Sequence, residues 1–280
     1  MVPEQSEPRQ VPGHSDEGLR RLRFQSRYWS EATLSLLETA GLERGMRVLD
    51  LGCGAGDLTF QVASLVGPEG RVIGIDRAPA AVASARARAE RLGFTQTRFC
   101  EAEIESLVLD EPVDAVVMRF VLMHLADPAG ALRRIAAQLP TGTVVVGMEL
   151  DLTTMRSVPS TPLYEDTVRG VRQVLEAGGV PLDLGATLWQ VYLAAGLGVP
   201  RLQTQVRVEP APAAATSRYL AEITGSLAAL RPEAFRLTEG RGVSLEERLM
   251  RQLSARRATT VSPLAVGAWV RKPFVLAAVE

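Results

Sequence analysis

The spacing of apolar residues alternates along the middle of the chain, which predicts strands separated by helices. Short apolar runs, of the length of buried strands, lie at residues 46–51, 71–76, 97–100, 113–118 and 143–150. Apolar residues at helical spacing lie between them, at residues 58–66, 80–91 and 128–139. Strands that are apolar on both faces and alternate with helices are typical of a parallel sheet with helices on both faces. We therefore expect an α/β fold with a Rossmann-like, mostly parallel sheet.

The pattern loosens on either side of this alternation. Residues 16–45 carry apolar positions at roughly helical spacing, which predicts an N-terminal helical cap. Later residues predict a loop with a helix, another helix, an alternating strand, two more helices and a last apolar run, at residues 151–179, 184–195, 201–208, 216–230, 244–257 and 266–279. We expect these elements to form a helical insert before the last strand.

We expect a single domain over residues 16–280, preceded by a flexible tail at residues 1–15. The tail carries three prolines and too few apolar residues to offset the entropy of ordering. The domain has four expected parts: the helical cap (16–45), a cofactor-binding core (46–150), substrate-side helices with a late strand (151–265) and a C-terminal strand region (266–280).

Composition narrows the classes of partner. The net charge of −1 gives no electrostatic case for nucleic acid, and there is no apolar run of about eighteen residues that would indicate a membrane span. The N-terminus lacks a secretory signal, and two cysteines are too few for a disulfide framework. No carboxylates or histidines show metal-ligand spacing. We expect a cytoplasmic monomer or homodimer that binds small molecules, but no nucleic acid, membrane or metal.

The stretch Val48 to Thr59, V-L-D-L-G-C-G-A-G-D-L-T, runs from a predicted strand through a glycine-rich turn into a helix. Glycines at such a turn allow positive φ and let a ligand approach the backbone, while the helix N-terminus offers free N–H groups to an anionic or carboxylate-bearing ligand. A dinucleotide turn has a third glycine where this chain has Asp57, which weakens that interpretation. Asp50, just inside the strand, favours a ligand with a positive group, such as an amino-acid moiety.

Together with V-I-G-I-D at residues 72–76, this stretch resembles the class I S-adenosylmethionine-dependent methyltransferases, of the ubiquinone/menaquinone-biosynthesis and natural-product type. The resemblance covers most of residues 41–150. It implies a seven-stranded sheet with S-adenosylmethionine as cofactor. It also implies that Asp50, Gly52 and Gly54 hold the methionine part, and that Asp76 accepts bonds from both ribose hydroxyls.

The segment F-C-E-A-E-I resembles the part of the family's third strand that meets the adenine. Glu103 then takes the place of an acid that is more commonly Asp, and the backbone N–H of Ile104 meets the ring. Cys53 and Arg77, which lie in the same cofactor segments, are further cofactor-binding candidates.

The segment from residue 113 to residue 128, V-D-A-V-V-M-R-F-V-L-M-H-L-A-D-P, resembles the family's fourth strand and its exit. The resemblance places Arg119 at the strand tip, able to reach cofactor or substrate. His124 lies where an acceptor hydroxyl approaches the methyl group, and an imidazole that titrates near neutrality can accept the proton that is released. Alternatively, His124 only hydrogen-bonds a loop.

Six residues are candidates for the substrate side: Tyr28, Trp29, Met123, Glu149, Tyr164 and Trp189. For the aromatic residues, ordinary packing in the core or in a lid is the alternative. Glu149 ends the fifth strand, where an acid either orients an acceptor or caps a helix.

The expected function is transfer of a methyl group from S-adenosylmethionine to a small acceptor by direct in-line displacement, with O-methylation of a secondary metabolite or quinone-like compound favoured. Two alternatives stay open. One is a cyclase-like or non-catalytic protein of the same fold that uses the cofactor structurally, and the other is an NAD(P)-dependent oxidoreductase.

Overall fold

A computed structural model describes residues 23–211, 215–235 and 243–273 of the chain. Its main sheet has the strand order β3-β2-β1-β4-β5-β10-β7. The strands are β1 (Arg47–Leu51), β2 (Arg71–Asp76), β3 (Thr97–Glu101), β4 (Ala115–Arg119), β5 (Val144–Asp151), β7 (Arg201–Gln205) and β10 (Leu264–Arg271). Strands β1 to β5 pair in parallel, and β10 lies antiparallel between β5 and β7. The expected seven-stranded, mostly parallel sheet is confirmed.

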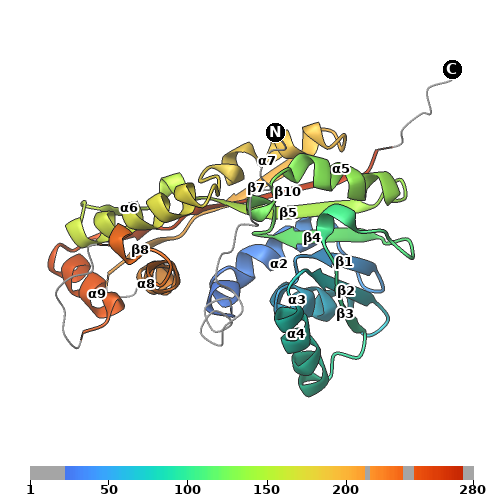
Figure 1. Cartoon of the computed structure of the whole chain (residues 1–280), viewed down its shortest axis with the longest axis horizontal. Coiled ribbons are helices and arrows are strands. Elements are labelled where there is room, and N and C mark those ends of the chain that lie inside the picture. Colours follow the sequence, from blue (N-terminus) through green and yellow to red (C-terminus); the bar gives the residue numbers. More distant parts are fainter. Residues whose placement is uncertain (1–22, 212–214, 236–242, 274–280) are drawn as a thin grey trace, which may run out of the picture. The chain divides into compact units, whose positions relative to one another are not determined.

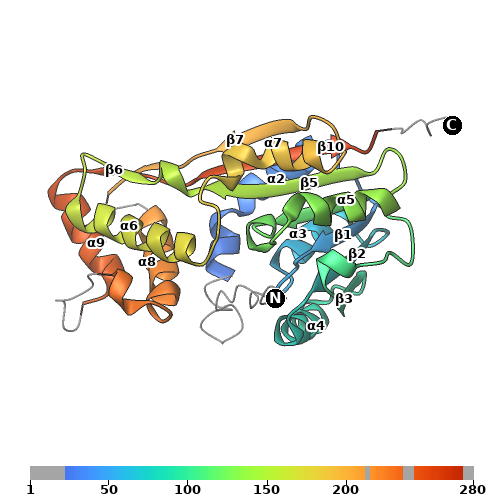
Figure 2. The same ribbon diagram turned by 45° about the horizontal axis from the view of Figure 1, so that its top comes forward.

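Helices cover both faces of this sheet (Figure 1). They are α2 (Ser30–Thr39), α3 (Asp57–Val66), α4 (Pro79–Leu92), α5 (Pro128–Gln138) and α7 (Leu184–Ala194). Helices α2, α3 and α4 lie on one face, while α5 and α7 contact each other on the opposite face (Figure 2). Residues 23–28 are also helical, as expected for the N-terminal cap.

Local signals in the sequence explain where two of these helices begin and end. Helix α4 begins with Pro79, whose fixed φ suits the first helical position, and ends at Gly93, which has a positive φ of 75°. Helix α5 begins after Asp127, whose side chain accepts a bond from the backbone N–H of Gly130 at 2.8 Å. Both helices lie within a residue or two of their predicted bounds.

Two glycines let helices pack directly on the antiparallel side of the sheet. A Cβ at Gly267 on β10 would lie 2.5 Å from the side chain of Leu36 on α2. A Cβ at Gly185 on α7 would lie 2.7 Å from the backbone nitrogen of Asp151, at the end of β5. A larger residue at position 185 would clash with the backbone of β5 and displace α7, whereas one at position 267 would require the Leu36 side chain to move.

The chain divides into two compact units, and the main sheet belongs to the larger one. The larger unit contains Leu22–Thr154, Asp183–Val206 and the residues from Pro263 onward, while the smaller contains Met155–Leu182 and Arg207–Ser262. This division does not test whether either unit folds alone, so the expected single domain over residues 16–280 stays a prediction. The expected tail at residues 1–15 lies outside the described residues.

The smaller unit combines a short sheet with helices that pack on one another. Its strand order is β6-β9-β8, with all pairs antiparallel. Its elements are β6 (Arg156–Val158), α6 (Pro162–Ala177), β8 (Val208–Pro210), α8 (Ala215–Ala228), η4 (Pro232–Ala234), α9 (Leu245–Ala255) and β9 (Thr259–Val261). The remaining 3-10 helices, in the larger unit, are η1 (Ile104–Ser106), η2 (Leu122–His124) and η3 (Leu152–Thr154).

Three features of the late chain differ from the expectation. The single strand predicted at 201–208 is two strands, β7 and β8. They belong to different sheets, because β7 pairs with β10 of the main sheet and β8 pairs with β9 of the short sheet. Strands β6 and β9 were not expected, since three residues are too few to show an alternating pattern. The last strand begins at Leu264, two residues earlier than expected, and ends at Arg271. The part of the expected run from residue 274 to residue 279 lies outside the described residues.

None of the helices in the described ranges is long and apolar enough to cross a membrane.

Candidate functional site

The turn from β1 into α3 is built on glycines in left-handed conformations. Gly52, Gly54 and Gly56 have φ of 69°, 53° and 86°, values that a residue with a Cβ adopts only at a cost. At Gly52 a Cβ would also lie 2.6 Å from a methyl carbon of Val121. Apart from its chain neighbours, no heavy atom of the described residues lies within 4 Å of the Cβ position of Gly54, so the turn is open there.

Asp50 lies just before this turn and is almost completely buried. Its Oδ2 accepts a bond from the Thr59 hydroxyl at 2.6 Å, while its Oδ1 has no hydrogen-bond partner among the described residues. Burial raises the pKa of this carboxyl to about 7, although Thr59 and the Arg119 guanidinium act in the opposite direction. A buried, half-paired carboxylate is a candidate binding group for a cation.

Asp76 fixes the end of β2 to the glycine turn. Its Oδ2 accepts a bond from the backbone N–H of Gly54 at 2.8 Å, and its Oδ1 accepts one from Ala78 at 2.9 Å. Each carboxylate oxygen can accept a second bond, so the group can still receive hydroxyls. The structure therefore brings Asp76 to the turn after β1.

Arg88 on α4 supports the far side of the turn, a role that the sequence pattern did not indicate. Its guanidinium donates to the carbonyl oxygen of Ala55 at 2.5 Å and to Asp57 at 2.7 Å. It also lies 5.0 Å from the centre of the Phe60 ring. The position that carries a third glycine in dinucleotide turns is thus occupied by an acid in an ion pair.

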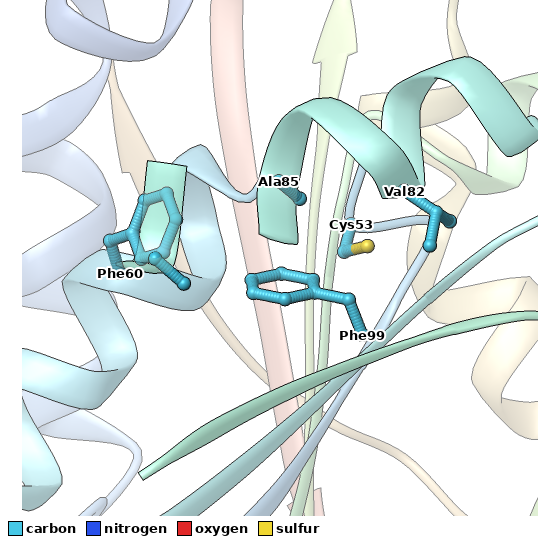
Figure 3. Close-up of a cluster of buried hydrophobic side chains, with 6 residues drawn as sticks. Cys53, Phe60, Val82, Ala85 and Phe99 are labelled. Atoms are coloured by element: carbon cyan, nitrogen blue, oxygen red, sulfur yellow. The ribbon is translucent and has the colours of Figure 1, made fainter. Parts of the chain in front are cut away.

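Cys53 turns its thiol into the core beside the turn. Figure 3 shows its sulfur among buried side chains of the neighbouring elements, including Val82 and Phe99. Burial raises the pKa of the thiol, and the backbone N–H of Cys53 is bonded to the Ile75 carbonyl oxygen at 2.8 Å. The thiol and this N–H are both engaged within the protein, and the cofactor-binding role expected for Cys53 stays a prediction.

Arg119, at the tip of β4, is held by an N-terminal helical segment, residues 23–39 including α2, and by α3. Its guanidinium donates to the hydroxyls of Ser26 at 2.8 Å and Thr33 at 3.0 Å, and to the Gln61 side chain at 3.2 Å. All three acceptors are neutral, and they fix the cation near enough to Asp50 to lower the pKa of that carboxyl.

The chain leaves β4 through Phe120, which has an unusual positive φ of 58°. The Phe120 ring lies against Trp29 with the ring centres 6.1 Å apart, and Trp29 contacts Tyr28 edge to face at 4.8 Å. Trp29 and Tyr28 are both buried. The structure thus places them beside the β4 exit, but within the packed interior.

Met123 and His124 lie on η2, directly after this bend. Met123 is buried, and His124 is partly exposed. Glu149 on β5 is fully buried, and its Oε1 accepts bonds from the backbone N–H groups of Val121 at 2.9 Å and Leu122 at 2.8 Å. Of the two roles considered for Glu149, this geometry corresponds to the cap.

The other candidate residues are more scattered. Arg77 and Glu103 are exposed near the ends of β2 and β3, and Ile104 is buried at the start of η1. Trp189 is partly exposed on α7, while Tyr164 is buried in the smaller unit. The roles predicted for these five residues stay predictions.

Comparisons with known proteins find similarity over the part of the chain that contains the glycine turn. A family model described as a methyltransferase domain matches residues 42–174. The ubiquinone/menaquinone biosynthesis C-methyltransferase UbiE of Idiomarina loihiensis is 33% identical over 125 residues, which is 44% of this chain and 49% of that protein. Over residues 42–174 the chain is therefore similar to a methyltransferase domain, the class that its glycine turn resembles.

Two further relatives extend the similarity beyond the glycine turn. Trans-aconitate 2-methyltransferase of Methylobacterium nodulans is 29% identical over 220 residues, covering 70% of this chain and 83% of that protein. The crystal structure of the Bacillus subtilis YcgJ protein covers 88% of this chain and all of the other, with 20% identity and a TM-score of 0.57, which shows the shared fold. The chain spans about half the length of the first curated relatives it matches.

Proposed function

We propose that this protein transfers the methyl group of S-adenosylmethionine to a small-molecule acceptor, at an oxygen atom of a secondary metabolite or quinone-like compound. The observation that carries this proposal is the turn after β1. There, Asp50 keeps one buried oxygen without a partner in the described chain, while Gly54 leaves open space. The name of the UbiE relative, a quinone-biosynthesis enzyme, supports a quinone-like acceptor.

The residues at the turn fit the parts of S-adenosylmethionine. The free Oδ1 of Asp50 suits the ammonium group of the methionine moiety. Asp76 suits the two ribose hydroxyls, since both of its oxygens retain a lone pair. Glu103 and the backbone of Ile104 would meet the adenine, and Arg119 would complement the carboxylate. When bound, the cofactor supplies an electrophilic methyl group on a sulfonium.

The remaining chemistry is proximity and proton transfer. The acceptor must be held in line with the methyl group, and such positioning supplies much of the rate in a direct displacement. His124 would accept the proton of an acceptor hydroxyl as the oxygen attacks. The bonds from Arg119 to Ser26 and Thr33 hold the N-terminal helical segment at the tip of β4, where it can limit the access of water.

Calorimetric titration with S-adenosylmethionine and, separately, with NADH tests the cofactor. We expect binding of the first alone, and binding of NADH alone would overturn the proposal in favour of an oxidoreductase. Incubation with methyl-labelled cofactor and a panel of phenols, hydroquinones and carboxylic acids tests the transfer. Labelled O-methyl product with S-adenosylhomocysteine is the expected result. Labelled carbon would overturn the choice of oxygen, and cofactor binding without transfer to any acceptor would favour the cyclase-like or structural alternative.

A further inference from the structure

One buried carboxyl group connects β5 to the exit of β4. Glu149 is fully buried on β5, and its Oε1 accepts the backbone N–H groups of Val121 and Leu122 at 2.9 and 2.8 Å. The residue before them, Phe120, donates its N–H to the carbonyl oxygen of Met148 at 2.9 Å. Three successive N–H groups of the exit are therefore bonded to two successive residues of β5.

These bonds lie where the chain needs outside support. Phe120 has a positive φ of 58°, which is strained for a bulky residue and persists only when its surroundings hold it. The bond from Phe120 fixes the bend itself, and the two bonds to Glu149 fix the residues that follow. Without an acceptor at Glu149, two buried N–H groups would be left unpaired next to this strained residue.

The supported exit also shapes the glycine turn. The side chain of Val121 fills the space that a Cβ at Gly52 would occupy, with 2.6 Å between that position and Cγ2 of Val121. In the other direction along the chain, Leu122 begins the short helix η2 that ends at His124. A shift of the β4 exit would therefore change the position of Val121 at the glycine turn and the position of His124, the candidate base.

Glu149 is placed to support this site rather than to touch an acceptor. Its side chain has no exposed surface, one oxygen is already engaged by two donors, and the other has no partner among the described residues. Reaching a ligand would require Glu149 to abandon the bonds that hold the exit.

We propose that Glu149 is a positioning residue of the methyl-transfer site, which holds the β4 exit so that Val121 packs on Gly52 and His124 faces the acceptor. This inference rests on the proposed function for its catalytic consequence, but the clamp itself can be measured without cofactor.

Hydrogen exchange at the amides of Val121 and Leu122 tests the clamp directly. Glu149→Gln keeps a carbonyl oxygen that can accept both bonds, whereas Glu149→Leu keeps the bulk but no acceptor. We expect exchange at both amides to accelerate at least tenfold in Glu149→Leu and less than threefold in Glu149→Gln. Val145→Ala is the matched control, because Val145 lies on the same face of β5 and is also buried. It should leave the exchange rates of the Val121 and Leu122 amides unchanged relative to those of the other amides of the sheet.

Binding and turnover then test the positioning. We expect Glu149→Leu to weaken S-adenosylmethionine binding at least fivefold and to lower kcat at least tenfold, with Glu149→Gln within twofold of wild type in both. Equal amide exchange in wild type and Glu149→Leu would overturn the clamp, as would a Gln variant as impaired as the Leu variant. If Glu149→Leu does not fold, Glu149→Asp replaces it, because the shorter side chain cannot reach both amides. If even the wild type binds no S-adenosylmethionine, the proposed function fails, while the exchange data still decide whether the clamp exists.

Discussion

Two acids in the larger unit differ in burial from two in the smaller one, since Asp50 and Glu149 are buried whereas Glu165 and Glu209 are only partly buried. In the larger unit, Asp50 and Glu149 each keep one buried oxygen without a partner in the described chain. In the smaller unit, Glu209 accepts the backbone N–H and hydroxyl of Thr216 at 2.8 and 2.6 Å, and Glu165 accepts the same two groups of Ser157, both at 2.8 Å. Glu209 and Glu165 each join a short strand to a helix. A buried carboxyl oxygen without a partner indicates a binding or positioning role, whereas a partly exposed acid that joins a strand to a helix indicates architecture.

The largest effect should follow from closing the glycine turn. Gly52→Ala adds a Cβ 2.6 Å from Val121 at a φ of 69°, and we expect it to weaken S-adenosylmethionine binding more than about 100-fold, measured by calorimetry. Gly45→Ala is the matched control, since its φ is 83° but no atom lies within 4 Å of the Cβ position. Near-normal binding by Gly52→Ala would show that the turn does not hold the ligand. Partial recovery in Gly52→Ala with Val121→Ala would assign the loss to this contact.

The buried acids should also make stability depend on pH. Burial raises the pKa of Asp50 to about 7 and that of Glu149 to about 8, well above the values of an unfolded chain. At pH values between the pKa of a carboxyl in the unfolded chain and its raised pKa in the folded protein, the folded protein binds more protons than the unfolded chain. The free energy of unfolding is therefore larger at pH 5 and falls as the pH rises to 8. We expect a decrease on the order of a few kcal/mol in denaturant titrations.

Substitution of Glu149 isolates its contribution to the decrease of the free energy of unfolding with pH. Glu149→Gln should make the dependence shallower by up to about 1.4 kcal/mol per pH unit. Glu111→Gln is the control, because Glu111 forms a largely exposed ion pair with Arg71. A wild-type curve that is flat or rises with pH would mean that these carboxyls are ionised in the fold.

The candidate base gives a smaller, more selective effect. His124→Ala should lower kcat at least tenfold with an oxygen acceptor, because the proton then has no positioned acceptor. Its affinity for S-adenosylmethionine, measured by calorimetry, should stay nearly unchanged. An unchanged kcat would reduce His124 to a structural residue of η2.

The smallest effects are expected for two adjacent residues of α8 in the smaller unit. Thr216→Val removes the hydroxyl bonded to Glu209 and should lower the free energy of unfolding by about 1 kcal/mol. Ser217→Ala removes a buried hydroxyl that has no partner among the described residues, and should change stability by less than about 0.5 kcal/mol. Cofactor affinity should be unaffected in both. A loss of cofactor affinity in either variant would contradict the inference that these residues serve only the architecture of the smaller unit.

The parts of the fold that sequence could predict are those with local signals. The strands β1 to β5 are short, mostly apolar runs in the sequence, and Pro79 and Gly93 indicate the two ends of α4. The three short strands of the smaller unit could not be predicted, because each has three residues and pairs with a partner far along the chain.

The same distinction applies to the candidate site. Gly52, Gly54 and Asp76 lie in a recognisable motif, and the structure brings them together. The contacts of Arg88 with Ala55 and of Glu149 with Val121 depend on packing between elements, and no sequence pattern predicts them. Sequence thus predicted a place for a ligand, but not what holds the proposed binding groups in position.

The antiparallel strand β10 has a consequence for biosynthesis. Strand β5 is complete at Asp151, but its neighbour β10 is complete only at Arg271, 120 residues later. At translation rates of about 5–20 residues per second, the ribosome needs roughly 6–24 s to supply that neighbour. During this interval the growing chain exposes an apolar strand edge, the kind of surface that invites aggregation and that chaperones cover.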